Sequence, residues 1–172
     1  MRRAAIIGCS VAAALIVLAI GAAVFVGSGV YNIGADDHHT KPVLAIIEQL
    51  RNRSVAVRAH AISVPNLEDS GSIAAGAKQY AALCVGCHLA PGVTKSDIRP
   101  GLYPHPPNLA QEDVDDAQRA FWIIKHGIKM SAMPAWGKSL NDGAIWDIVS
   151  FVKHMPAMTP ETFQQLSTVR SE

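Results

Sequence analysis

The sequence of 172 residues is poor in aromatic side chains, cysteine and net charge. Three cysteines are too few for a disulfide scaffold. A net charge of +1, without a run rich in lysine and arginine, gives no support for nucleic-acid binding. The sequence also lacks strand-like runs, internal repeats and glycine-rich phosphate loops. What is left is a small helical protein, with room for one compact domain plus an anchor or a tail.

A long uncharged segment opens the chain. Residues 4–30 carry no charge and follow Arg2 and Arg3. About 20 apolar residues cross a bilayer core, whereas a cleaved signal peptide has a shorter apolar core, about 7–15 residues, and a small-residue cleavage site. We therefore expect residues 1–34 to form an uncleaved transmembrane anchor with its arginines in the cytoplasm. Cys9 loosely fits a lipoprotein box, but it precedes the apolar run, so we interpret it as a small residue of the helix.

Residues 35–69 are predicted to be a linker with a short amphipathic helix. Thr40 suits a helix cap, and Pro42 suits the first turn of a helix near 42–52. Such a linker could let the following domain swing. The adjacent His38 and His39 are open to two interpretations, a metal pair or a solvated loop, because neighbouring histidines alone define no coordination geometry.

Residues 70–158 are predicted to form a compact, all-α domain, with 159–172 as a C-terminal tail. Three helices are predicted here: one over 72–84 capped by Ser72 or Asp69, one over 112–127 that ends at Gly127, and one over 142–155 capped by Asn141 and stopped by Pro156. The loop between the first two contains five prolines, which exclude regular structure through most of it.

The first of these helices ends in a C-x-x-C-H motif made by Cys84, Cys87 and His88. Zinc needs about four ligands, usually from two pairs, and only one pair is present. A thioredoxin-type redox pair needs a βαβ setting, which this helical region lacks. The third interpretation is covalent attachment of one haem c, in which two thiols add to the vinyl groups and the histidine binds the iron. We favour haem, with zinc and thiol redox chemistry as the alternatives.

A methionine loop, "MSAMPAWG", offers a ligand for the opposite face of the iron. A thioether is a soft ligand that stabilises ferrous iron, and Met/His ligation is usual in electron transfer. Met133 precedes Pro134, which restricts the backbone and so aims the side chain. We predict Met133 as the ligand, with Met130 as the competitor. Simple packing is the alternative for either methionine.

These motifs resemble the class I c-type cytochromes. Gly76, Tyr80 and Cys84 follow one another at intervals of four, on one helical face, as in that family. The methionine loop resembles the family's G-M-P-x-[FW]-G, with Ala132 in place of the glycine. The resemblance implies a small cytochrome c fold of three to five helices around a covalently bound haem, here preceded by one transmembrane helix.

The resemblance also implies two packing features. A last helix would cross the first at Gly76, with Trp146 and Phe151 packing on it. A proline carbonyl, from Pro106 or Pro107, would hold the Nδ1–H group of the axial histidine and orient the ring.

Iron ligated by both His88 and Met133 has no vacant position, so we expect an electron-transfer protein and not an enzyme. It would be a membrane-anchored monohaem cytochrome c on the periplasmic side of a bacterial inner membrane. Its partners would be the bilayer and redox proteins such as a quinol-oxidising complex, a dehydrogenase or a terminal oxidase. It would serve as a tethered carrier or as a fixed subunit of a respiratory or dehydrogenase complex. Nucleic acid is not expected.

Surface lysines either form a basic ring for an acidic partner or are scattered; they are Lys95, Lys125, Lys129 and Lys138. An apolar shell around the haem would exclude water; its candidates are Leu109, Phe121, Trp122, Ile124, Trp136 and Ile148. The alternative function is a haem enzyme, peroxidase-like, or a gas or redox sensor with a labile methionine ligand. An enzyme would need a distal acid or base, for which His105, His126 and His154 are the downstream candidates.

Overall fold

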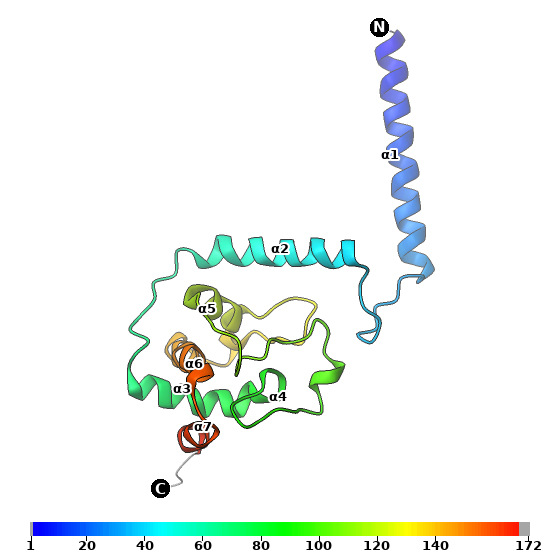
Figure 1. The fold of residues 1–172 in the computed structure, drawn as a ribbon. Helices are drawn as coiled ribbons and strands as arrows, with labels where there is room; N and C mark the ends of the chain where they lie inside the picture. Colours follow the sequence, from blue (N-terminus) through cyan, green and yellow to red (C-terminus); the bar gives the residue numbers. More distant parts are fainter. Residues whose placement is uncertain (1, 169–172) are drawn as a thin grey trace. The chain divides into compact units, whose positions relative to one another are not determined.

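The computed structural model describes residues 2–168 and divides into two compact units, Met1–Asp37 and His38–Glu172. The first unit contains one long helix, α1 (Arg2–Ser28), which Figure 1 draws in blue. Its apolar span, Ile6–Ser28, is 23 residues long and has no buried part. At 1.5 Å per residue the span measures about 35 Å, enough to cross a bilayer core. A signal sequence has a similar length and composition.

The second unit is built from helices and loops. Its α-helices are α2 (Lys41–Ala59), α3 (Ser70–Leu83), α4 (Val85–His88), α5 (Ala117–His126), α6 (Asp142–His154) and α7 (Pro160–Ser167). Three short 3-10 turns join them: η1 (Arg99–Gly101), η2 (Trp136–Lys138) and η3 (Met155–Ala157). Residues 2–168 contain no β-strand beyond an isolated bridge between Ala90 and Val93. The predicted all-α fold of the small cytochrome c type is confirmed.

Side-chain caps explain where the main helices begin. The carboxylate of Asp69 accepts a hydrogen bond from the Ser72 amide at 2.8 Å, so Asp69 and not Ser72 caps α3. The side chain of Asn141 caps α6 by accepting from the Ala144 amide at 2.9 Å, as predicted. Asp116 caps α5, which therefore begins later than residue 112.

The core forms where α3 crosses α6. A Cβ atom added at Gly76 would overlap the carbonyl oxygen of Asp147, so only glycine permits this close crossing. Phe151 packs on the buried ring of Tyr80, with 5.2 Å between ring centroids, as the resemblance implied. Trp146 does not share that role, because it stacks on Phe121 of α5 at 4.2 Å in a second buried cluster.

Helix α2 is longer than predicted and belongs to the domain. It runs to Ala59 instead of about residue 52 and packs on α5, with Val55 and Ala59 buried. The side-chain Nε2 of Gln118 donates to the carbonyl of Ile62, just beyond the helix end. Since α2 packs on α5, the part of residues 35–69 that could still act as a spacer excludes this helix.

The chain beyond residue 158 also adds to the core. Thr159 caps α7, and Phe163 is buried against the α3–α6 cluster. This part of the expected tail is thus folded, whereas residues 169–172 lie outside the described residues. The signal was present in the sequence, since Thr159 followed by Pro160 is a common helix start.

Candidate functional site

The C-x-x-C-H motif lies on a single helical turn that directly follows α3. The amides of Cys87 and His88 both donate to the carbonyl oxygen of Cys84, at 3.0 and 2.9 Å. The chain leaves this turn through Leu89, whose φ is +62°. The hydroxyl of the buried Tyr80 donates to the Leu89 carbonyl at 2.7 Å and so holds that exit. The two thiols and the imidazole are thereby presented from one short, fixed segment.

The ring of His88 is oriented by the proline-rich loop. Its Nδ1 lies 3.0 Å from the carbonyl oxygen of Pro107, which distinguishes this residue from the other candidate, Pro106. Burial is the largest influence on the ring and lowers the pKa of His88, which favours the neutral form. Since a carbonyl only accepts, Nδ1 carries the proton and Nε2 keeps its lone pair. The ring is therefore prepared to bind a metal through Nε2.

Arg99, which the sequence analysis did not single out, joins the motif to this loop. Its Nε donates to the Cys87 carbonyl at 3.2 Å, and its Nη2 donates to the Pro106 carbonyl at 2.7 Å. The two acceptors are neighbours of His88 and Pro107, so one guanidinium bridges both sides of the histidine's hydrogen bond. A lone arginine inside a proline-rich loop was the available signal.

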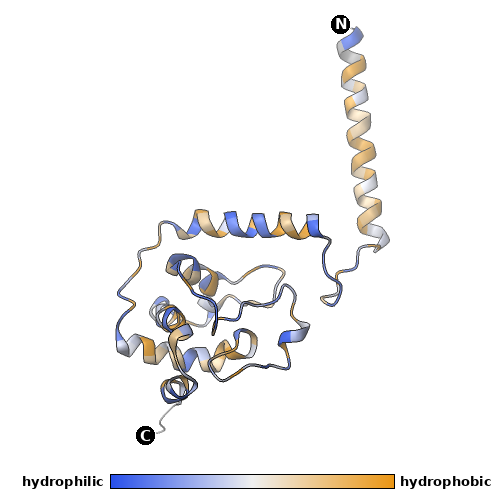
Figure 2. Ribbon diagram, in the orientation of Figure 1, coloured by the Kyte–Doolittle hydropathy of each residue, from blue (hydrophilic) through white to orange (hydrophobic). Residues whose placement is uncertain are grey.

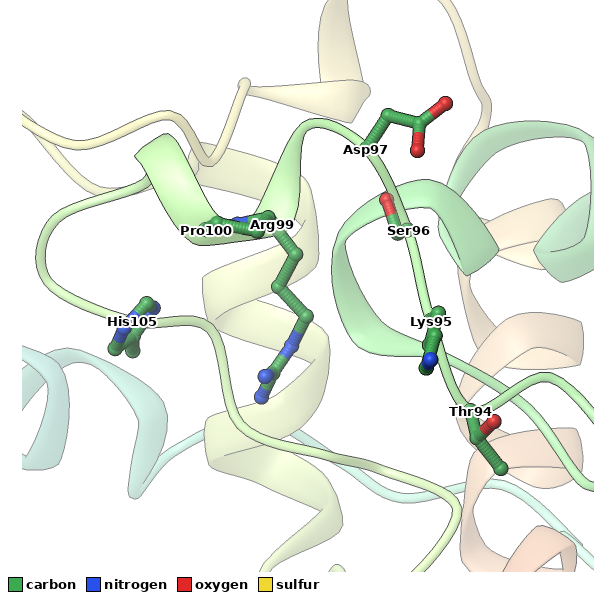
Figure 3. Close-up of a pocket in the computed structure, with 7 residues that line it drawn as sticks. All are labelled: Thr94, Lys95, Ser96, Asp97, Arg99, Pro100 and His105. Atoms are coloured by element: carbon green, nitrogen blue, oxygen red, sulfur yellow. The ribbon is translucent and has the colours of Figure 1, made fainter.

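Figure 3 shows the Arg99 side chain extending from η1, with Asp97 directed away from it. A recess of about 600 Å³ opens here. It is lined by Thr94, Lys95, Ser96, Asp97, Arg99, Pro100 and His105. The recess places positive charge next to the attachment motif.

Cys84 does not suit thiolate chemistry. Cys84 is 9% exposed, and burial raises the pKa of its thiol to about 12, so the reactive thiolate is disfavoured. The zinc alternative also gains no support, since residues 2–168 contain no group of three or more histidine, cysteine or acidic side chains placed to hold a metal. His38 and His39 contact Tyr103 instead: the His38 ring stacks on it at 4.4 Å, and His39 meets it edge-on at 5.4 Å.

The methionine loop packs closely against the end of α5. Gly127 has φ +64°, and a Cβ atom there would lie 2.7 Å from the Met133 carbonyl oxygen. The Ile128 amide donates to that oxygen at 3.2 Å, and the Ser131 hydroxyl accepts from the Met133 amide at 3.2 Å. Met133 is half-buried, whereas Met130 is 93% exposed with φ +58°. The structure thus separates the two candidate methionines by exposure.

The other predicted residues have varied surroundings. Lys125 forms an ion pair with Asp142, with Nζ 2.6 Å from Oδ1, while Lys95, Lys129 and Lys138 are exposed. Among the apolar candidates, Phe121 and Ile148 are buried. The remaining four are partly buried: Leu109, Trp122, Ile124 and Trp136.

Two of the three downstream histidines are in contact with neighbouring side chains. The ring of His126 lies 4.8 Å from that of Trp122, and the Nε2 of His154 lies 2.9 Å from Glu68. His105 is exposed at the rim of the recess.

A small all-α domain that offers two thiols and a metal-ready histidine from one turn has the architecture of a c-type cytochrome. Residues 71–152, just under half of the chain, match the family model described as "Cytochrome C oxidase, cbb3-type, subunit III". This region is therefore a class I c-type cytochrome domain, which binds haem c covalently and serves in electron transfer. Comparison of the chain with curated proteins and with solved structures gave no significant match.

Proposed function

We propose that the haem is attached through Cys84 and Cys87 and ligated by His88 and Met133. The observation that carries this proposal is the hydrogen bond between His88 Nδ1 and the Pro107 carbonyl, at 3.0 Å, which leaves Nε2 for the iron. Met133 is favoured as the ligand because its side chain is half-buried, whereas the side chain of Met130, three residues earlier, is exposed. The bound haem supplies a centre that accepts and releases one electron at a time.

Residues of the chain would fix the two segments that ligate this centre. Tyr80, Arg99 and Pro107 fix the turn that carries the histidine, while Gly127 lets the methionine loop approach α5. With both His88 and Met133 bound, the iron would have no open position for a substrate, which favours outer-sphere electron transfer. Of the three residues considered as distal acid or base, His126 and His154 contact other side chains, so neither of these two supports the enzyme alternative.

We further propose that α1 anchors the domain in a bacterial inner membrane. Arg2 and Arg3 before the apolar span favour a cytoplasmic N-terminus and a periplasmic haem domain. The anchor would comprise residues 1–34, and residues 35–69, which include α2, would connect it to the haem domain. An anchored cytochrome meets its partners at raised local concentration in the membrane.

The redox partners of this scheme are membrane complexes. A quinol-oxidising complex or a dehydrogenase would deliver electrons, and a terminal oxidase would accept them. The family's description as an oxidase subunit favours an oxidase as acceptor, with the chain as a tethered carrier or a fixed subunit.

The ligand assignment is tested by comparing the optical spectra of the purified wild-type protein and the Met133→Ala variant. We expect a low-spin reduced spectrum and a weak sulfur-to-iron charge-transfer band that disappears in Met133→Ala. Met130→Ala is the matched control and should keep the band. A high-spin wild-type protein that binds carbon monoxide readily would contradict the assignment, as would loss of the band in Met130→Ala alone. Absence of covalent haem would overturn the whole proposal.

A further inference from the structure

Helix α2 has a second apolar face that no described part of the domain covers. Its inner side packs on α5, yet Ile46, Leu50 and Val57 on the other side are 68%, 70% and 57% exposed. At 3.6 residues per turn these three positions fall within about 40° of one another around the helix. Figure 2 shows apolar and polar residues alternating along α2. We call the stripe formed by Ile46, Leu50 and Val57 the outer stripe.

The charge of α2 is strongly positive. The helix carries four basic residues and a single acid, Glu48, which gives it a net charge of +3. Arg53 is exposed on the same side as the outer stripe, and Lys41 is exposed at the start of the helix. An apolar stripe with arginine beside it, on a helix of net positive charge, is typical of helices that lie on an anionic lipid surface.

The connection to α1 brings a lipid surface within reach. Helix α1 ends at Ser28 and α2 begins at Lys41, so twelve residues join them. Twelve residues span at most about 40 Å when fully extended. If α1 crosses a membrane, as proposed above, α2 cannot leave the vicinity of the membrane surface.

The small area of the outer stripe also favours a lipid surface over a protein as its binding partner. Three aliphatic side chains supply far less than the roughly 800 Å² that each partner buries in a stable protein complex. A helix that is already tethered at a membrane needs much less, because the tether keeps its effective concentration at the surface high.

We propose that α2 is an interfacial helix that lies on an anionic bilayer through its outer stripe. Ile46, Leu50 and Val57 enter the boundary between headgroups and acyl chains, and Arg53 reaches the phosphates. Since the opposite face of α2 packs on α5, the helix fixes the tilt of the cytochrome domain relative to the membrane. This inference rests on the proposed anchor and is independent of the identity of the haem ligands.

The test uses the full, haem-loaded chain in vesicles that contain phosphatidylglycerol. Cysteine is introduced at position 50 in a Cys9→Ser background, and its reaction with a membrane-impermeant maleimide is timed. Asn52→Cys is the matched control, because Asn52 is also exposed but lies about 160° away around the helix. Ile46→Cys is a second stripe position in case Leu50→Cys fails to fold, with haem absorption reporting on folding.

We expect cysteine at positions 50 and 46 to react several-fold more slowly than cysteine at position 52, with less protection in vesicles of phosphatidylcholine alone. Equal rates at all three positions would overturn the inference. Protection that fades as the protein is diluted with more lipid would also overturn it, because a second copy would then be the cover. Vesicle flotation tests the anchor separately: a chain that does not float with lipid would refute the anchor and this inference together, while leaving the haem spectrum unaffected.

Discussion

The two segments that carry the expected iron ligands are held in different ways. The histidine turn is fixed by hydrogen bonds from three directions, through Tyr80 in α3, Arg99 in η1 and the Pro107 carbonyl. The methionine loop has three local hydrogen bonds, two through Ser131 and one from the Ile128 amide to the Met133 carbonyl, and it packs closely on Gly127. We therefore expect the histidine side to tolerate the loss of any one contact. The methionine side has only local hydrogen bonds and depends in addition on one steric condition, the absence of a side chain at Gly127.

The largest effect is expected from Gly127→Ala, which places a side chain where the methionine loop packs on Gly127. The new Cβ atom would lie 2.7 Å from both the Met133 carbonyl oxygen and the Pro134 carbonyl carbon, and φ +64° disfavours alanine. We expect partial or complete loss of methionine ligation and a free energy of unfolding lower by about 2–4 kcal/mol. The charge-transfer band and denaturant unfolding measure the two effects.

Gly101→Ala is the control for this experiment, because among the described residues no atom beyond its chain neighbours lies within 4 Å of its added Cβ. It should keep the band and lose little stability. An intact band in Gly127→Ala would contradict the view that the glycine positions the loop.

The next largest effect is expected from Arg99→Gln, on the histidine side. Loss of two charge-assisted hydrogen bonds should lower the free energy of unfolding by about 1–3 kcal/mol. Removal of a positive charge near the haem should also lower the reduction potential, because the ferric state gains relative stability. Arg99→Lys keeps the charge but not the two-point bridge, so it should recover the potential more than the stability. Redox titration and denaturant unfolding separate the two terms, and loss of low-spin ligation would show that this side is less robust than proposed.

A smaller effect is expected from Tyr80→Phe. The variant removes only the hydroxyl that donates to the Leu89 carbonyl at 2.7 Å and keeps the packing on Phe151. We expect a loss of about 1–2 kcal/mol in unfolding free energy and an unchanged optical spectrum. A change of ligation state in this variant would mean that one contact alone holds the histidine turn.

The smallest effect is expected from Met130→Gly. Met130 holds φ +58°, which costs a side-chain-bearing residue energy that glycine avoids, although glycine also loses more entropy on folding. We expect a stability change below about 1 kcal/mol in either direction and an unchanged charge-transfer band. Thermal unfolding followed at the haem band measures the change, and a lost band would identify Met130 as the ligand.

The sequence predicted those parts of the molecule that depend on local chemistry. The Asn141 cap and the stop at Gly127 follow from short-range rules, and both are present. The packing of Phe151 followed from the family resemblance. The C-x-x-C-H motif also contained enough information to indicate haem, since its spacing alone limits the chemistry.

The remainder depended on contacts between distant segments. The bridge made by Arg99 joins two carbonyls that only the folded loop brings together. Trp146 was assigned to the wrong neighbour, because two faces of α6 are apolar and the sequence does not say which helix covers each. The full length of α2 was missed because its inner face becomes useful only when α5 lies beneath it.

The burial of Cys84 bears on the order in which the protein is assembled. A bond between its sulfur and a carbon of the porphyrin requires the two atoms to meet, yet the sulfur is enclosed by the same helices that form the core. Burial also keeps the thiol protonated, which slows addition. Attachment is therefore easiest while α3 and α6 are still apart, and closure of that crossing would then seal the linkage inside. We therefore expect the covalent chemistry to precede completion of the native fold in this domain.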